Sequence, residues 1–177
     1  MSEPLVSYHE ILPSIADELA ERGSRAILVL DASALGVIED EYGSDAYNEV
    51  RSRMLRLIDE QRGKDFRSDD LVALDQPGGL RFLFFLGPKR RRALPTGTAD
   101  LKAMKVRMAT SLAPALARAA FPYLKVAPRV ELGYGLAIHN PLVRPERLVL
   151  RALDDALKLA AHEREAERLA VQERLLD

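Results

Sequence analysis

The sequence of 177 residues has no cysteine, no tryptophan and only three histidines. The lack of cysteine excludes disulfide bonds, thiolate nucleophiles and cysteine-ligated metals, and it fits a reducing compartment. The histidines, His9, His139 and His162, are scattered along the chain without the spacing of a metal site. The sequence therefore offers neither a thiol nor a histidine cluster on which catalysis or metal binding could be based.

A charge excess and long hydrophobic runs are also missing. The 26 basic and 27 acidic residues give a net charge of −1, so the chain has no overall attraction to nucleic acid or to an anionic membrane. No apolar run approaches the roughly 20 residues of a membrane-spanning helix. The N-terminal segment MSEPLVSYHEILPS contains acidic residues and lacks the apolar core of a signal peptide. We expect a cytoplasmic protein with no nucleic-acid partner and no membrane partner.

What is present is enough apolar sequence, 47% of the residues, to form the core of one domain. The stretch DDLVALDQPGGLRFLFFL (69–86) predicts a β-hairpin, because a Pro-Gly-Gly turn joins two short apolar runs. RAILVLD (25–31) predicts a buried central strand, and RVELGYGLAIH (129–139) predicts another strand. Patterns of helical period predict the remaining elements, with Pro114 expected to kink or split the helix that contains it. The predicted helices cover residues 7–22, 32–42, 44–62, 98–121 and 145 onward.

Helices that separate strands, together with an antiparallel hairpin, predict the α/β class. We expect an α+β sandwich in which helices flank one mixed, mainly antiparallel sheet. Asp31 ends the predicted central strand, a common place for ligand chemistry in such folds, although capping of the next turn is the simpler interpretation.

Several motifs appear in an order that resembles a known family. LVLDASALGVIEDEYGSDAYNEV keeps Asp31, Asp40, Tyr42 and Gly43 in register with a strand ending in Asp and a following pattern like N-D-x-x-G-H-x-x-G-D. RSDD (67–70), GGLRF (78–82) and LDDALKLAA (153–161) match an R-x-x-D site, a G-G-D/E-E-F hairpin and a last helix with A-D-x-A-L-Y-x-A-K. The ordered set, over roughly residues 25–161, resembles the GGDEF domain of diguanylate cyclases, which make cyclic di-GMP from two GTP.

The departures from that family concern the groups that the resemblance assigns to metal and GTP. Leu80 and Arg81 replace the two acidic residues of the signature, which leaves Asp31 as the only remaining ligand-type position for a divalent metal. Glu39 and Asn48 stand at the guanine-binding positions, and Ala161 and Glu165 replace the phosphate-binding Lys and Arg. Because phosphoryl transfer depends on metal positioning and charge neutralisation, we expect no catalytic residues, no resident metal and no cyclase activity.

The resemblance leaves one ligand site open. Arg67 and Asp70 keep the R-x-x-D spacing of the family's inhibitory site, which binds cyclic di-GMP. Arg can form a bidentate contact with a guanine edge or a phosphate, and Asp can accept from guanine N–H groups. The alternative is that RSDD is an ordinary polar loop between a helix and a strand. A shifted hairpin that brings Asp75 near Asp31 would be a route back to activity, but a slip of one residue would turn every side chain to the other face.

The sequence divides into an N-terminal helix (1–24), a degenerate GGDEF-like domain (25–161) and a charged C-terminal helical extension (162–177). In the extension, Arg164–Glu167 and Glu165–Arg168 are spaced for ion pairs along a helix. We expect a regulatory or protein-interaction module of bacterial signalling, whose partner is another protein, a second copy of itself or a downstream domain of a longer chain. The alternative function is a cyclic di-GMP receptor that uses Arg67 and Asp70.

Overall fold

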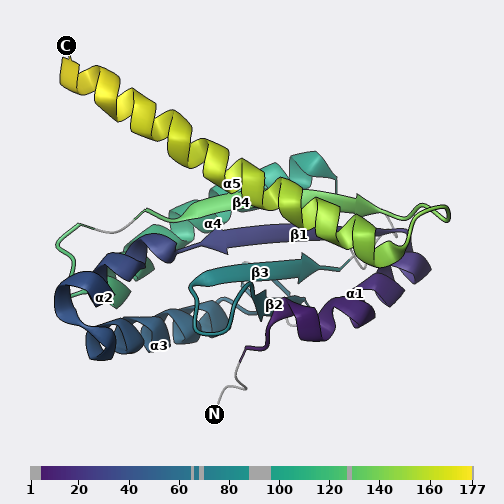
Figure 1. The fold of residues 1–177 in the computed structure, drawn as a ribbon, viewed down its shortest axis with the longest axis horizontal. Helices are drawn as coiled ribbons and strands as arrows, with labels where there is room; N and C mark the ends of the chain where they lie inside the picture. The colour runs from purple at the N-terminus through teal and green to yellow at the C-terminus, as the bar shows by residue number, and fades with distance from the viewer. Residues whose placement is uncertain (1–4, 65, 68–69, 88–96, 127–128, 177) are drawn as a thin grey trace.

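The computed structural model describes residues 5–64, 66–67, 70–87, 97–126 and 129–176 (Figure 1). Its elements follow the predicted order of helix, strand, two helices, hairpin, helix, strand and helix. The helices are α1 (Tyr8–Arg22), α2 (Val37–Tyr42), α3 (Ser44–Glu60), α4 (Thr98–Ala120) and α5 (Pro145–Leu176), with a short 3₁₀ helix, η1 (Ser33–Gly36), before α2. The strands are β1 (Ser24–Asp31), β2 (Leu71–Leu74), β3 (Arg81–Leu86) and β4 (Glu131–Ile138).

The described strands form one sheet in the order β2-β3-β1-β4, and each neighbouring pair is antiparallel. The continuous apolar run of β1 is explained by its central place, since both its faces are covered and seven of its eight residues are buried. The predicted sandwich with a mainly antiparallel sheet is therefore confirmed. Parallel pairing occurs in two isolated bridges outside the named strands, Ser7 with Leu74 and Arg62 with Phe66.

The two faces of the sheet are covered by different helices. Alternate residues of β1 divide between them: Leu28 and Leu30 belong to a core under α2, α3 and α4, whereas Ile27 and Val29 belong to a core under α1 and α5. Figure 1 shows α1 and α5 on one side of the sheet and α4 on the other. The N-terminal helix is thus packed on the same sheet as the rest, through Ile15 and Leu19.

Two glycines of β4 bring helix α5 unusually close to the sheet. A Cβ at Gly133 would lie 1.8 Å from the carbonyl oxygen of Ala156, and one at Gly135 would lie 2.0 Å from that of Ala152. The helix backbone therefore rests directly on the strand backbone, which only residues without side chains permit. This contact sets the direction of α5, which extends past the sheet toward the C-terminus (Figure 1).

Pro114 does not split α4, which continues from Thr98 to Ala120. Proline removes the hydrogen bond to the carbonyl of Thr110 four residues earlier. Both residues are exposed, so water can satisfy that carbonyl and the helix continues.

Candidate functional site

Asp31 lies at the end of the central strand and is the centre of a group of charged side chains. Its residue is 5% exposed. One carboxylate oxygen accepts the backbone N–H of Ser33 at 2.9 Å, as in the capping interpretation. The other accepts hydrogen bonds from two arginines, so both oxygens of Asp31 are engaged.

The first arginine is Arg81, which faces Asp31 directly in the β1–β3 pairing. Its Nε and Nη2 donate to one Asp31 oxygen, each at 3.2 Å, and its Nη1 donates to Asp75 at 2.7 Å. The hairpin thus holds Asp75 and Asp31 on one guanidinium. The arginine neutralises the carboxylates at the place that the resemblance assigns to a metal.

The second arginine, Arg164, comes from α5. Its guanidinium donates to Asp31 at 3.3 Å and binds Glu131 at 2.5 Å. Glu131 is the residue of β4 directly opposite Asp31. Neighbouring Glu163 pairs with Lys105 of α4, so two residues of the predicted extension contact the body of the domain.

Opposing effects act on the ionisation of Asp31. Burial alone would raise the pKa of its carboxyl group, but the hydrogen bonds from Ser33 and the charge and hydrogen bonds of Arg81 outweigh it, and the pKa is lowered. Asp31 is therefore a stable anion that is held by cations from its own chain.

The residues around Asp31 do not fit a divalent cation. Leu80, at the first acidic position of the resemblance, is 3% exposed and belongs to the core, and a hydrocarbon side chain cannot ligate a metal. Two guanidiniums bind one oxygen of Asp31, the Ser33 N–H binds the other, and the two positive charges would repel a metal cation. Among the residues that the structure describes, no group of three or more His, Cys, Asp or Glu side chains could hold a metal ion.

The guanine-binding positions of the resemblance also contain interactions within the chain. Glu39 accepts a hydrogen bond from the Ser44 hydroxyl at 3.0 Å, and Asn48 is exposed on α3. Next to Asn48, the Tyr47 hydroxyl donates to the Gly78 carbonyl at 3.3 Å and ties the hairpin turn to α3. On α5, Ala161 is exposed and Glu165 pairs with Arg168 at 2.9 Å, as predicted. The side chain of Glu167 lies outside the described part of the structure.

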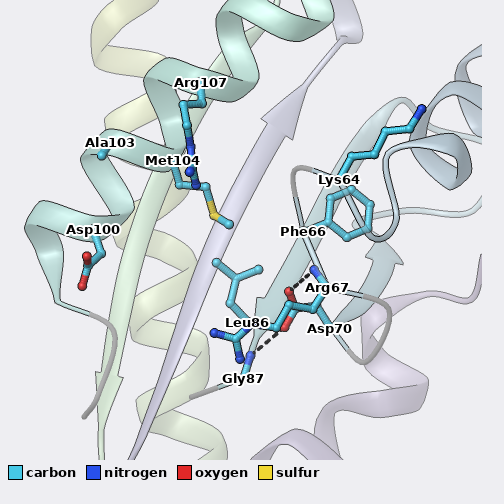
Figure 2. A pocket seen from close by; sticks show the side chains of 10 residues that line it. All are labelled: Lys64, Phe66, Arg67, Asp70, Leu86, Gly87, Asp100, Ala103, Met104 and Arg107. Atoms are coloured by element: carbon cyan, nitrogen blue, oxygen red, sulfur yellow. Dashed lines mark hydrogen bonds between the residues drawn. The ribbon is translucent and has the colours of Figure 1, made fainter. Parts of the chain in front are cut away.

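Arg67 and Asp70 line one pocket, as the R-x-x-D interpretation requires. It measures about 330 Å³ and lies between the end of β3, the start of α4 and the segment after α3. Figure 2 shows Met104 and Arg107 facing it from α4. Its cationic lining residues are Lys64, Arg67 and Arg107, and its anionic ones are Asp70 and Asp100.

Asp70 has a structural task within that pocket. Its carboxylate accepts the backbone N–H groups of Arg67 and Gly87, each at 2.9 Å (Figure 2). The residue is 4% exposed. It thus joins Arg67, before β2, to Gly87, directly after β3. A ligand of this pocket would contact Arg67 and Arg107 more readily than Asp70.

The residues that sequence reasoning missed are Glu131, Arg164 and the role of Asp75. The signal for Glu131 was its position at the start of a strand, which an antiparallel pairing places beside Asp31. Arg164 carried no such signal, because its predicted partner was Glu167 on the same helix.

Comparison with known proteins relates the chain to other proteins by structure. No protein-family model and no curated protein sequence matches it. Among solved structures it resembles the GGDEF domain of FimX from Pseudomonas aeruginosa, with a TM-score of 0.61 and 11% identity over 88% of this chain and 86% of that one. It also resembles the GGDEF domain of YfiN (TpbB) from the same organism, with a TM-score of 0.56 and 20% identity over 90% and 86% of the two chains.

A third similar structure is the diguanylate cyclase SiaD from Pseudomonas aeruginosa in complex with its activator SiaC, with a TM-score of 0.56 and 20% identity. This chain is covered over 85% of its length and spans 52% of SiaD. At these identities the likeness establishes the fold, so the chain has the fold of GGDEF domains. In the described part of the chain, no helix has the length and hydropathy needed to span a bilayer.

Proposed function

We propose that this chain is a degenerate GGDEF domain that does not make cyclic di-GMP and that acts in bacterial signalling as a regulatory, protein-binding module. The observation that carries the proposal is the contact of Arg81 with Asp31 and Asp75. The resemblance assigns a divalent metal to this strand end. Here a guanidinium lies there, fixed to two carboxylates.

The energetic argument supports inactivity. To admit a metal, the chain would have to break the Arg81 contacts and those of Arg164 at a residue that is almost fully buried. Each ~1.4 kcal/mol lost from transition-state stabilisation slows a reaction about tenfold, and metal, base and phosphate contacts are all changed. At the guanine-binding position Glu39 lacks the N–H donor of an amide. At the phosphate-binding position the charge of Glu165 would repel the phosphates of GTP.

The test is incubation of the full chain at high concentration with GTP and either Mg²⁺ or Mn²⁺, followed by chromatography for cyclic di-GMP. We expect no product and, by calorimetry, no binding of GTP. An active diguanylate cyclase assayed in parallel controls for the conditions. Turnover of GTP that rises with the concentration of this chain would contradict the proposal.

A domain that has lost its catalytic groups can still bind another protein through its surface, and the proposed regulatory role rests on this. SiaD was solved in complex with a protein activator, and this supports protein binding as a use of such a domain. We place the chain in the cytoplasm, consistent with its lack of cysteine. The unit that binds a partner is residues 25–161, with the N-terminal helix on its sheet and residues 162–177 as an extension.

The second candidate function is a cyclic di-GMP receptor at Arg67 and Asp70. The observation in its favour is the 330 Å³ pocket with Arg67, Arg107 and Lys64 in its wall. Guanidinium groups suit both guanine edges and phosphates. Asp70, whose oxygens are already used by the backbone, would serve by holding Arg67 in place.

Calorimetry with cyclic di-GMP tests this candidate. If the chain is a receptor, the wild-type chain binds cyclic di-GMP, and the Arg67→Ala and Arg107→Ala variants bind it at least tenfold more weakly. Arg56→Ala, an exposed arginine on α3 outside this pocket, is the matched control. If the wild-type chain gives no heat of binding, or the Arg67→Ala variant gives the same heat as wild type, the receptor function is ruled out.

A further inference from the structure

Another cavity lies between the middle of α4 and the start of β4. It measures about 350 Å³, similar to the pocket at Arg67, and Figure 1 shows α4 passing behind β4. Its lining is apolar except for one arginine and comprises Ala109, Leu112, Ala113, Leu116, Arg129, Val130 and Leu132. A concave, mainly apolar cavity of this size with few polar groups is the usual form of a small-molecule site.

Short side chains on α4 help to make the cavity. Ala109 and Ala113 lie one turn apart on the helix and are exposed, so each leaves room that a longer side chain would occupy. Leu112, Leu116 and Leu132 are 1%, 2% and 2% exposed and belong to the core. A hydrocarbon group in the cavity would therefore pack directly on the core of the domain.

The charged groups of the cavity favour an anion. Arg129, just before β4, is its one cationic residue, and none of the described residues that line it is acidic. The neighbouring carboxylate of Glu131 binds Arg164 of α5. Because successive strand residues point to opposite faces, Glu131 and Leu132 lie on different sides of the sheet. An anionic ligand would thus meet a guanidinium with no carboxylate in the cavity wall.

The main chain of β4 adds a second donor. The His139 N–H donates to the Gly23 carbonyl at 2.8 Å, and in the β1–β4 register every second residue of β4 pairs with β1 in this way. Glu131 is one of them, so the N–H and C=O of Leu132 point away from β1. β4 is at the edge of the described sheet, and no described backbone group pairs with Leu132 on that side.

We infer that this cavity binds a small apolar carboxylic acid. The hydrocarbon part packs against the two alanines of α4 and Leu132, and its burial supplies binding energy. The carboxylate accepts hydrogen bonds from the Arg129 guanidinium and the Leu132 N–H, and such charge-assisted bonds are stronger than neutral ones. The inference goes beyond the proposed function and does not depend on it, since the cavity shares no residue with the Asp31 cluster or with the pocket at Arg67.

Titration of the full chain with octanoate tests the site. Methyl NMR follows binding, because the alanine and leucine methyl groups of the lining report where the ligand lies. We expect saturable shifts at Ala109, Ala113 and Leu116, with a dissociation constant of about 1 mM or lower. Octan-1-ol has the same chain length without the charge and should bind at least about tenfold more weakly.

Two substitutions test the two parts of the site separately. Ala109→Leu fills the apolar space, so octanoate should bind at least about tenfold more weakly while thermal stability is kept. Arg129→Gln removes the cation, so octanoate binding should weaken by at least about tenfold while octan-1-ol binding is unchanged. Arg129 is exposed, so the second variant tests the site even if the first does not fold.

The matched controls are Ala99→Leu, in the first turn of α4, and Arg118→Gln, near its end. Both positions are exposed and lie outside the lining of the cavity, so octanoate binding should be unchanged. All variants are checked by circular dichroism.

The absence of saturable shifts up to about 10 mM octanoate overturns the inference. So does octanoate binding that Ala109→Leu or Arg129→Gln leaves intact, equal affinity of the wild-type chain for octanoate and octan-1-ol, or methyl shifts confined to residues outside the cavity. None of these results bears on cyclase activity, which the incubation with GTP tests independently.

Discussion

Arg164 donates a hydrogen bond to Asp31 across 133 residues of chain, at 3.3 Å. It joins the last helix to the end of the central strand. Arg81 approaches the same carboxylate oxygen from the hairpin. The strand end at which the resemblance expects a metal is therefore held together by arginines from two different elements.

Replacement of Arg81 by alanine tests the strength of that arrangement. The variant leaves Asp75 and the nearly buried Asp31 with fewer donors. Because 35% of the Arg81 side chain is exposed, solvent screening limits the effect. We expect a loss of about 1 kcal/mol in the free energy of unfolding, measured in urea.

The matched control for Arg81→Ala is Arg62→Ala. Arg62 pairs with Asp59 at 3.5 Å on the surface, with both side chains more than a third exposed. Its loss should change stability by less than about 0.5 kcal/mol. Equal effects of the two substitutions would show that the Asp31 cluster contributes nothing beyond an ordinary surface pair.

Acid should destabilise the chain partly through Asp31. Its pKa is lowered in the folded state relative to the ordinary value of 3.8, so its contribution to stability is present above that value and is lost as the pH falls through the folded pKa. Wild type should therefore lose unfolding free energy more steeply than Asp31→Asn between about pH 5 and pH 2. Urea unfolding at several pH values measures the slopes, with the exposed Asp40→Asn as control.

Alanine at Gly133 or Gly135 should disturb the packing of α5. The added Cβ would lie within 2.0 Å of a helix carbonyl oxygen, so the helix must move. We expect each variant to lose about 2 kcal/mol or more, as for severe overpacking. Gly36→Ala is the control, because a Cβ there meets nothing within 4 Å. Thermal unfolding that is equally affected in all three variants would contradict the close contact.

Asp70→Asn should be costly although it is nearly isosteric. Both backbone donors, from Arg67 and Gly87, now find an anion in a site that is 4% exposed. An amide offers one acceptor oxygen and would point N–H groups at the second donor. We expect a loss of about 1–3 kcal/mol in unfolding free energy. A stable Asp70→Asn chain would mean that this carboxylate is available to a ligand.

The elements that sequence reasoning predicted correctly are those that local pattern determines. The apolar run of β1 and the Pro-Gly-Gly turn of the hairpin define their elements without knowledge of the rest of the chain. The motif order put Arg81 at an acidic position of the signature, whereas its place opposite Asp31 is given by the register of β1 and β3. Of the two outcomes expected for Pro114, a kink or a split, the split is wrong, because α4 continues through that residue.

The ionic contacts of Arg164 could not be predicted in this way. Helical spacing suggested Glu167, whose side chain lies outside the described residues, and it gave no sign of the contacts with Glu131 and Asp31. Those contacts depend on where α5 crosses the sheet, and the crossing depends on Gly133 and Gly135 of another element. Long-range contacts of this kind become visible only when the direction of the helix is known.

The close contact of α5 with Gly133 and Gly135 restricts how this helix can move on the sheet. Since no side chain lies between helix and strand at those two points, α5 can tilt there but cannot slide without a collision of main-chain atoms. Ala160, which lies against Gly133, is about one turn before Arg164 on the same helix. The two glycines thereby determine which carboxylates the Arg164 guanidinium can reach, namely those of Asp31 and Glu131.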